Sequence, residues 1–477
     1  MLANVRKGKA MALDDTLKIA DDYLDAHWED MVADINMLVR IPSFKEEALA
    51  GPDAPWGPGP RAALTAGLDL AESMGFRKHD LNGYVGWADL HGADITQVGI
   101  IGHMDVVPAG PGWHFEPYQV TRKDGFLLGR GVFDDKGPSV VALHAVNALH
   151  QAWGTLPYTV RFIFGADEEC GMGDIPYYRA AQPDPAFVFT PDASFPVCYG
   201  EKGHYDATVV SAPLDGGCIV AFEGGQAPNA VPGQATCIIR ADEGDIPGTD
   251  RITVTPKGCG LVELFAQGKS AHASTPAGGI NAIGLLVDHL LEHAPLSPIE
   301  RDFLQLEQKI LGATDGSGVG LAASDDDFGS LTLVGGVITF EDGRLNQTVD
   351  CRYPTNVMAE QITDKLTACA VANGALVYDA HAQGPFVVDA SRPEIQALLD
   401  AYVEVTGQEA KPFTMGGGTY AREFRNAASY GPGFPGFTKP DWVGSMHGPD
   451  EGVSEETLRQ AFRIYVVALA KLMQLSL

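Results

Sequence analysis

Apolar residues recur at near-helical spacing in two segments of the first part of the chain. Residues 14–40 show this spacing, and the pattern ends before Pro42. A Gly- and Pro-rich loop at 50–60 separates them from residues 61–75, where the spacing returns. Apolar residues spaced in this way lie on one face of a helix. The first part of the chain is therefore predicted to contain two helices.

Three short, mostly apolar runs follow, and each predicts a buried strand. The runs lie at 98–103, 158–164 and 186–190, and a helix is predicted at 137–151. Continuous apolar runs are typical of strands that are buried on both faces of a parallel sheet. Polar residues gather just past the ends of these strands, where open α/β sheets form their binding sites. The pattern therefore predicts one crevice at the carboxyl ends of the strands.

The sequence changes character after about residue 198. Strand-like runs outnumber helices from there to about residue 385, and two helices are predicted, at 280–294 and 357–373. This change predicts a separate, inserted α+β domain at 198–385. The strand-like runs lie at 205–211, 218–223, 235–241, 251–255, 261–267, 331–340, 346–353 and 375–381.

Helical patterning resumes after the insertion. Residues 393–406 predict one helix and residues 454–475 another, which would begin with Ser454 as its N-cap. The flanking parts of the chain, residues 1–197 and 386–477, are therefore expected to form one discontinuous catalytic domain. We expect an α/β fold for it, with a mostly parallel, mixed sheet that is flanked by helices.

Length and composition set broad limits. A chain of 477 residues is too long for one ordinary core, and its 45% of hydrophobic residues describe a globular protein. The sequence has no run of about 18 apolar residues and no apolar stretch that would suit a secretory signal, so we expect neither a membrane span nor export. Seven cysteines without a CxxC pair favour free thiols in a reducing compartment, which predicts a cytoplasmic protein.

The charge balance of the chain is acidic. Lys and Arg number 33, Asp and Glu number 62, and the formal net charge is −29. Such a charge disfavours nucleic acids and anionic membranes as partners. Two divalent ions would offset only about four charges, so most of the excess is expected on the solvated surface.

Five short segments contain residues that bind divalent metals. They supply two histidines and several carboxylates, a ligand set that suits Zn²⁺ or Mn²⁺. One such segment would be weak evidence, but five in one chain, mostly at predicted strand ends or loops, predict a hydrolytic metal centre. The segments are His103–Pro108, Gly131–Gly137, Asp167–Gly171, Pro191–Ala193 and His447–Glu451.

The carboxylates of these segments can serve different roles. Asp105 lies two residues after His103, so in an extended segment both side chains project to one side and the carboxylate can orient the imidazole. Asp134 lies among glycines, which leave room for an ion, and one carboxylate can bridge two cations. Glu168 and Glu169 are adjacent, so one can bind a metal while the other acts as a general base.

Three stretches resemble the signature sequences of the co-catalytic di-metal M20 peptidases, a family that includes aminoacylases, glutamate carboxypeptidases, desuccinylases and dipeptidases. They are Gly102–Pro108, Gly129–Gly137 and Asp167–Glu169, and the likeness spans nearly the whole chain. The resemblance implies two bound metal ions, with Zn²⁺ favoured and Mn²⁺ or Co²⁺ also compatible. The implied ligands are Asp134 as the bridge, His103 and Asp192 for one metal, and Glu169 and His447 for the other.

The resemblance also implies roles around the metals. Glu168 would be the general base, and Asp105 would orient His103. The peptide bond between Asp134 and Asp135 would be cis, as in this family.

The insertion is about twice as long as a single-copy lid of this family, and it resembles the doubled lid of bacterial Xaa-His (carnosinase-like) dipeptidases. The segments that carry this likeness are Pro228–Pro232, Lys269–Ser274, Asp350–Pro354 and Gly416–Arg422. By resemblance, His272 would donate to the developing oxyanion and Asn229 would line the substrate site. Arg352 and the backbone amides of Gly416, Gly417 and Gly418 would hold the C-terminal carboxylate of a substrate, since a guanidinium fork and a glycine loop both suit that anion.

The resemblance implies a metal-dependent hydrolase of dipeptides with a free C-terminal carboxylate, in which a water bridging the metals attacks the peptide bond and Glu168 is the general base. An alternative is an N-acyl amino acid deacylase of the same family, of the desuccinylase or acetylornithine deacetylase type. A binding protein that kept the fold and lost catalysis is a third possibility, and the intact metal segments argue against it. Because a doubled lid makes a second subunit unnecessary, we expect a functional monomer.

Overall fold

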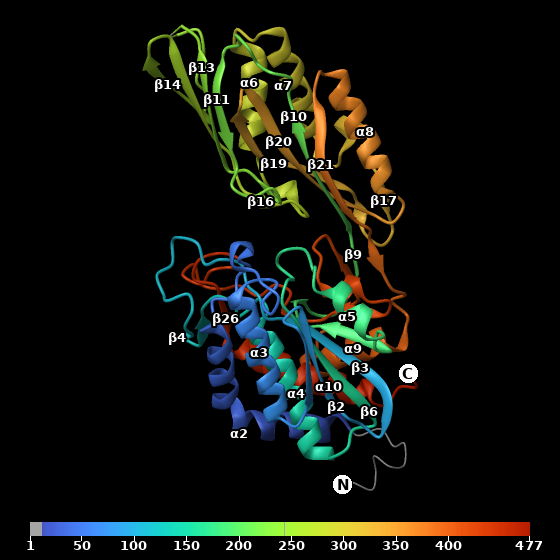
Figure 1. Ribbon diagram of the computed structural model, residues 1–477. Helices are drawn as coiled ribbons and strands as arrows, with labels where there is room; N and C mark the ends of the chain where they lie inside the picture. Colours follow the sequence, from blue (N-terminus) through green and yellow to red (C-terminus); the bar gives the residue numbers. More distant parts are fainter. Residues whose placement is uncertain (1–11, 243) are drawn as a thin grey trace. The chain divides into compact units, whose positions relative to one another are not determined.

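The computed structural model describes residues 12–242 and 244–477, and this part of the chain divides into two compact units. The discontinuous unit contains the chain up to Tyr199 together with Val387–Phe413 and Thr419–Leu477. The inserted unit contains Gly200–Phe386 and Thr414–Gly418. Each unit has its own sheet and its own helices (Figure 1).

The assignment of one loop differs from the sequence prediction. Gly416, Gly417 and Gly418 were expected in the discontinuous domain, because they lie after residue 386. The structure groups Thr414–Gly418 with the inserted unit instead. The physical reason is local, since the backbone N–H of Lys202 donates to the Met415 carbonyl and Thr414 Oγ1 donates to the Asp327 carbonyl at 2.5 Å.

A mixed sheet forms the centre of the discontinuous unit. Its strands lie in the order β1-β2-β6-β3-β7-β24-β9-β22, and β23 pairs with β9. The run β6-β3-β7-β24 is parallel, and β2 and β1 are added antiparallel at one side. The strand bounds are β1 (Arg77–Leu81), β2 (Val85–Leu90), β3 (Asp94–His103), β6 (Tyr158–Gly165), β7 (Phe187–Thr190), β9 (Cys198–Glu201), β22 (Phe386–Val387), β23 (Phe413–Met415) and β24 (Ala427–Ser429).

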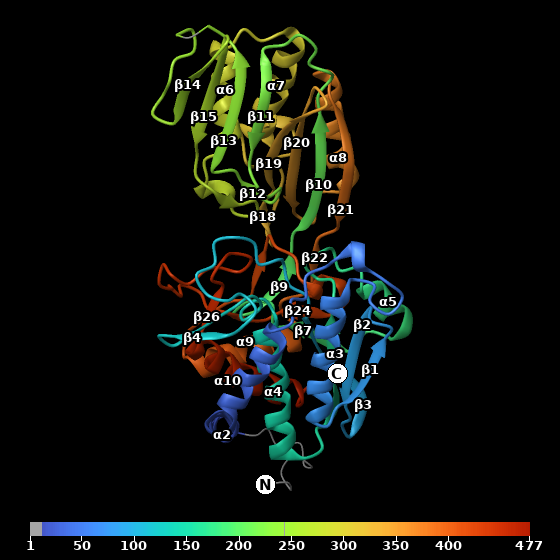
Figure 2. The same ribbon diagram turned by 60° about the vertical axis from the view of Figure 1, so that its left-hand side comes forward.

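Helices cover both faces of this sheet, which explains why its strands are mostly apolar. Helix α3 packs closely on one face, since a Cβ atom at Gly67 would lie 3.0 Å from the Phe164 ring of β6. On the opposite face, Tyr178 of α5 contacts the Trp87 ring of β2. The fold class predicted for this unit is confirmed (Figure 2). The helices are α2 (Leu13–Val39), α3 (Pro58–Ser73), α4 (Lys136–Trp153), α5 (Ile175–Ala181), α9 (Pro393–Thr406) and α10 (Glu455–Leu472).

The last helix begins at the predicted cap. Ser454 Oγ accepts a hydrogen bond from the backbone N–H of Thr457 at 2.9 Å. This bond satisfies one of the backbone donors that the first turn of a helix leaves without a partner. Helix α10 then packs against α2, α4 and α9, so the C-terminal segment is joined to the N-terminal part of the unit.

The inserted unit is built on an eight-stranded sheet in the order β14-β15-β13-β11-β19-β20-β10-β21. All of its strand pairs are antiparallel. Helices lie on one face of the sheet (Figures 1 and 2). The strands are β10 (Gly203–Val210), β11 (Ile219–Gly224), β13 (Gln234–Arg240), β14 (Ile252–Gly258), β15 (Leu261–Gln267), β19 (Thr332–Glu341), β20 (Arg344–Tyr353) and β21 (Leu376–Gln383).

This sheet consists of two four-stranded halves, as a doubled lid requires. A single pair of residues, Gly224 and Ile338, joins β11 of one half to β19 of the other. Helix α6 (Ala282–His293) packs on β13 and β15 of the first half, and α8 (Ala359–Ala372) packs on β10 and β21 of the second.

A third helix of the inserted unit, α7 (Pro298–Leu311), was not predicted. Its start carries a capping box, in which Ser297 and Glu300 satisfy each other's backbone N–H groups. Its buried face includes two carboxyl groups, Glu300 and Glu307, which interrupt the apolar spacing. Neither carboxylate oxygen of Glu307 has a hydrogen-bond partner in the described structure.

The Glu307 carboxyl should make the inserted unit less stable as the pH rises. Burial raises the pKa of Glu307 from 4.5 to about 8, so between these values the folded chain keeps a proton that the unfolded chain releases. The free energy of unfolding therefore falls over this range. Relative to wild type, Glu307→Met is expected to gain stability from pH 5 to pH 8, on the order of 3 kcal/mol, in urea denaturation. Glu360→Met, on the exposed part of α8, is the control; an equal difference for Glu307→Met at both pH values would contradict the prediction.

Candidate metal centre

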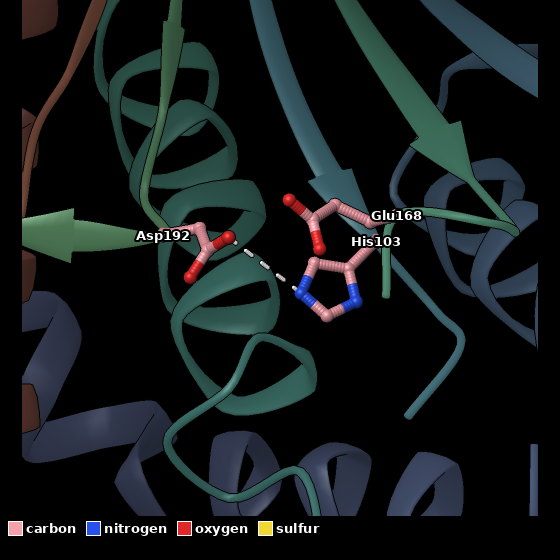
Figure 3. Close-up of side chains that lie close together, drawn as sticks. All are labelled: His103, Glu168 and Asp192. Carbon is pink, nitrogen blue, oxygen red and sulfur yellow. Dashed lines mark ion pairs between the residues drawn. The ribbon is translucent and has the colours of Figure 1, made fainter. Parts of the chain in front are cut away.

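Side chains from the predicted segments meet at the carboxyl ends of the parallel strands. His103 is the last residue of β3, and the register pairs it with Gly165, the last residue of β6. Glu168 follows β6, and Asp192 follows β7. Figure 3 shows His103, Glu168 and Asp192 converging from these three strands, with Asp192 Oδ2 3.7 Å from His103 Nε2.

The Asp134 carboxylate lies at the centre of this group. Its Oδ1 atom is 3.0 Å from Nε2 of His103, and its Oδ2 atom is 3.0 Å from Nε2 of His447. Glu169 Oε2 is also 3.0 Å from Nε2 of His447. One carboxylate therefore faces two histidines with two different oxygens, and the peptide bond from Asp134 to Asp135 is cis, as predicted.

Within residues 12–242 and 244–477, two sets of side chains have the spacing of a metal site. His103, Glu168 and Asp192 form one, and His103, Asp134 and Glu169 form the other. Within each set the potential ligand atoms all lie within 4.8 Å of one another. Imidazole and carboxylate groups at this spacing are the donors that Zn²⁺ and Mn²⁺ take in proteins.

Asp105 orients His103 in a way that the sequence did not indicate. Nδ1 of His103 lies 2.9 Å from the backbone carbonyl oxygen of Asp105 and 3.6 Å from its carboxylate Oδ1. The carboxylate instead accepts hydrogen bonds from the backbone N–H groups of Glu168 and Glu169, at 3.2 and 3.1 Å. Asp105 therefore holds both the imidazole and the loop that carries the paired glutamates.

The electrostatics of the centre favour bound cations. Burial raises the pKa of the Glu168 and Asp192 carboxyls well above the usual range, and other carboxylates nearby add to the effect. Burial likewise raises the pKa of Glu169. So many acids cannot all ionise in one buried place unless positive charge lies among them.

The pKa shifts of His447 and Asp134 also indicate that positive charge stabilises this centre. Hydrogen bonds with Asp134 and Glu169 raise the pKa of His447 to about 11. Burial opposes ionisation of Asp134, but hydrogen bonds with His103 and His447 hold the pKa of that carboxyl below its usual range. Divalent cations can take the place of the imidazole protons, since metal binding requires neutral imidazole. The donor set therefore fits divalent metal ions.

A second set of contacts fixes the loop that carries the glutamates. Asp167 Oδ1 lies 2.9 Å from Nζ of Lys45, and its Oδ2 accepts from the backbone N–H of Gly173. Asp174 Oδ2 accepts from the Ala166 N–H and from the Tyr420 hydroxyl. Both ends of the loop are thus held by buried carboxylates.

In the inserted unit, Asn229 and His272 lie next to each other. Strands β12 (Ala230–Val231) and β16 (Ala271–His272) pair, and the backbone N–H of Ala273 donates to the Asn229 carbonyl at 2.9 Å. Nδ1 of His272 accepts from the backbone N–H of Ser274 at 3.1 Å. With Nδ1 as the acceptor, Nε2 is the ring nitrogen that can donate a hydrogen bond.

Arg352 lies in the same unit and contacts the glycine loop. Its Nη1 donates to the Gly416 carbonyl at 3.3 Å, and Gly417 and Gly418 follow in the chain. The ideal Cβ position of Gly416 is 2.5 Å from Cβ of Ser274, so only glycine fits beside the His272 segment. The structure thus gathers Asn229, His272, Arg352 and Gly416 in one unit.

Sequence reasoning missed the residue that holds Arg352. Asp350 accepts from Nε and Nη2 of Arg352, both at 2.8 Å, and also lies 3.0 Å from Nε2 of His204. The spacing Asp350, Arg352 was a usable signal, because residues two apart on a strand lie on the same face. Asp350 therefore holds the Arg352 guanidinium in one orientation.

The sequence matches the family described as Peptidase family M20/M25/M40 over residues 99–471. The chain belongs to this family, and it is a hydrolase. The family resemblance inferred from the motifs is confirmed, and the matched range contains all five candidate metal segments.

Individual relatives agree with this assignment. The chain is 31% identical over 463 residues to the Bacillus subtilis protein "Putative dipeptidase YtjP", which covers 93% of this chain and 97% of that protein. It is 30% identical over 458 residues to the Staphylococcus epidermidis protein "Putative dipeptidase". That match covers 92% of this chain and 96% of the other protein.

Solved structures show the same fold over nearly the whole chain. Human carnosine dipeptidase 1 is 15% identical, with a TM-score of 0.62, and the match covers 98% of this chain and 100% of that one. The aminoacylhistidine dipeptidase from Vibrio alginolyticus is also 15% identical, with a TM-score of 0.55 and coverage of 93% and 96%. Among the helices of the described residues, none is long and apolar enough to cross a membrane.

Proposed function

We propose that this protein is a metal-dependent dipeptidase that cleaves dipeptides with a free C-terminal carboxylate. The observation that carries the proposal is the Asp134 carboxylate, whose two oxygens each lie 3.0 Å from a different histidine, His103 and His447. The dipeptidase names of the similar proteins support the choice of substrate.

Asp134, His103, Asp192, Glu169 and His447 would hold two divalent cations, with Zn²⁺ the best match to the donors and Mn²⁺ or Co²⁺ also compatible. When bound, the cations supply Lewis acidity and lower the pKa of water at the site.

The remaining steps belong to the side chains of this chain. Glu168 takes a proton from the attacking water and returns it to the leaving amine, a role that suits a carboxyl whose pKa burial has raised. Nε2–H of His272 donates to the oxygen on which negative charge develops. Arg352, held by Asp350, binds the C-terminal carboxylate of the substrate together with the amides of Gly416, Gly417 and Gly418.

The alternative of an N-acyl amino acid deacylase is tested with a panel of three substrates. These are an Ala-type dipeptide, the same dipeptide with a C-terminal amide, and N-acetylalanine, each with defined metals after chelation. We expect the free dipeptide to be cleaved fastest. Faster cleavage of N-acetylalanine would overturn the dipeptidase assignment and favour the deacylase.

The same panel tests Arg352. Arg352→Lys keeps the charge but loses the planar fork, so KM for the free dipeptide is expected to rise about 10–100-fold. Hydrolysis of the amidated dipeptide should stay the same, because that substrate has no carboxylate to lose. Equal effects on both substrates would show that Arg352 acts on the fold and not on the carboxylate.

We further propose that the protein works as a monomer, in the cytoplasm. Both edge strands of the inserted sheet are irregular, β21 opposite Asp206–Thr208 of β10 and β14 between Pro256 and Gly258. Bulges and prolines at sheet edges oppose strand pairing between molecules. Light scattering on the purified enzyme measures its mass; a stable dimer would contradict this proposal.

A further inference from the structure

The loops that carry Asp134 and His447 are joined by one buried carboxylate, that of Glu451. Glu451 is fully buried, and it lies four residues after His447 in the chain. Its Oε1 accepts hydrogen bonds from three backbone N–H groups, those of Gly131, Phe133 and Asp134, at 3.1, 3.0 and 3.2 Å. The Glu451 carboxylate therefore binds the backbone of Asp134, which is itself a proposed metal ligand.

Arg130 completes the connection from the other side. The side chain of Arg130 is 1% exposed, and its Nη1 donates to Oε2 of Glu451 at 2.5 Å. Its Nη2 donates to the carbonyl of Gly448, the residue after His447, at 3.3 Å. The guanidinium also lies over the Trp113 ring, 5.3 Å from its centroid. Arg130 thus connects the Asp134 loop to Gly448 and Glu451, both of which follow His447 in the chain.

The backbone of the His447 turn requires such support. His447 and Asp450 have φ angles of +62° and +55°, the left-handed region that non-glycine residues adopt only when their surroundings hold them there. The Asp450 carboxylate accepts from the backbone N–H groups of His114 and Phe115. The Glu451 carbonyl accepts from the N–H of Gly129 at 2.9 Å.

We propose that Glu451 and Arg130 are positioning residues that fix His447 against Asp134, so that the cation held by Asp134, Glu169 and His447 binds tightly only when this pair is intact. The inference rests on the proposed metal-dependent function. Glu451 is assigned no contact with substrate, because every contact of its carboxylate named above is to the Asp134 loop. The inference therefore adds a supporting role to the proposed function. Loss of such supporting groups costs metal affinity, typically about 10–100-fold.

The test is a Zn²⁺ titration of the chelated full-length protein by calorimetry. In Glu451→Gln, an amide replaces the carboxylate without changing its shape, and its N–H₂ group would oppose Arg130 or the backbone donors. We expect two Zn²⁺ ions to bind wild type, and one of the two sites to weaken about 10–100-fold in the variant while the other is unchanged. Zn²⁺ binding to Glu451→Gln that matches wild type at both sites would overturn the inference.

The matched control is Asp89→Asn, which removes a buried ion pair of similar exposure elsewhere in the unit. Asp89 accepts from Nε and Nη2 of Arg161, both at 2.8 Å, on β2 and β6. Both variants should lower the unfolding temperature, but only Glu451→Gln should weaken Zn²⁺ binding. An equal loss of Zn²⁺ affinity in Asp89→Asn would show that general destabilisation explains the effect of Glu451→Gln. That result would overturn the proposal.

Arg130→Lys keeps the test decisive if Glu451→Gln does not fold. Lysine keeps a charge beside Glu451 but cannot also reach the Gly448 carbonyl, so a smaller loss at the same site is expected. Unchanged binding in Arg130→Lys, with Glu451→Gln unfolded, would refute the proposal. If wild type itself binds no Zn²⁺, the proposed metal-dependent function fails instead, and the two failures are thereby told apart.

Discussion

Glu168→Gln is expected to lower kcat for dipeptide hydrolysis by about 10²–10⁴-fold while both metal ions stay bound. The substitution keeps the size and shape of the side chain, but an amide cannot take a proton from water. Glu168 lies beside His103 and Asp192 on the loop after β6 (Figure 3), and burial raises the pKa of its carboxyl well above the usual range. A buried base that gains a proton readily can also return it to the leaving amine.

The measurement pairs steady-state kinetics with metal analysis of the same samples. Glu72→Gln, an exposed carboxylate on α3 that pairs with Lys78, serves as the control and should keep wild-type activity. Near wild-type turnover in Glu168→Gln with two metals bound would remove Glu168 from catalysis. Loss of a metal from this variant would make Glu168 a ligand, a role that its spacing from His103 and Asp192 also allows.

Parts of the fold were predictable because the sequence pattern there reflects burial. Strands β6 and β7 and the second half of β3 are buried, so their sequences are mostly apolar, with Arg161 in β6 as the charged exception. Parallel strands end at one edge of the sheet, and this geometry brings His103, Glu168 and Asp192 together although they are far apart in sequence.

Other elements were missed because polar residues occupy their buried positions. Strand β2 is buried throughout and still contains Asp89, whose charge is paired by Arg161 on the neighbouring strand. Helix α7 buries Glu300 and Glu307 on its inner face, which hides the helical period. A sequence shows the carboxylate at each of these positions but not the partner or the burial that explains it.

The supporting residues of the site were hidden for a related reason. Glu451 and Arg130 are 321 positions apart, and Glu451 is one of 62 acidic residues in the chain. Glu451 ends the segment that contains His447, but that segment does not show whether the Glu451 carboxylate is buried or solvated. The motifs indicated the groups that meet the metals and Asp105 beside them, whereas the contacts of Glu451 and Arg130 are visible only in the folded chain.

Asp134→Ala is expected to abolish binding of both metal ions and all measurable hydrolysis. The reason is that the two oxygens of one carboxylate, each 3.0 Å from Nε2 of a different histidine, serve both halves of the centre. Glu169→Ala is the matched comparison, because that carboxylate lies 3.0 Å from His447 and belongs to one half. We expect it to keep one ion.

Metal content after dialysis separates the two variants from each other and from chelated wild type. Chelated wild type should lose activity and recover it when Zn²⁺ or Mn²⁺ is added, whereas Asp134→Ala should not recover, since its site lacks the shared ligand. Two ions retained by Asp134→Ala would show that the bridging assignment is wrong. One ion retained by Asp134→Ala would place Asp134 in a single half of the centre, and the histidines would then have to bind their metals independently of each other.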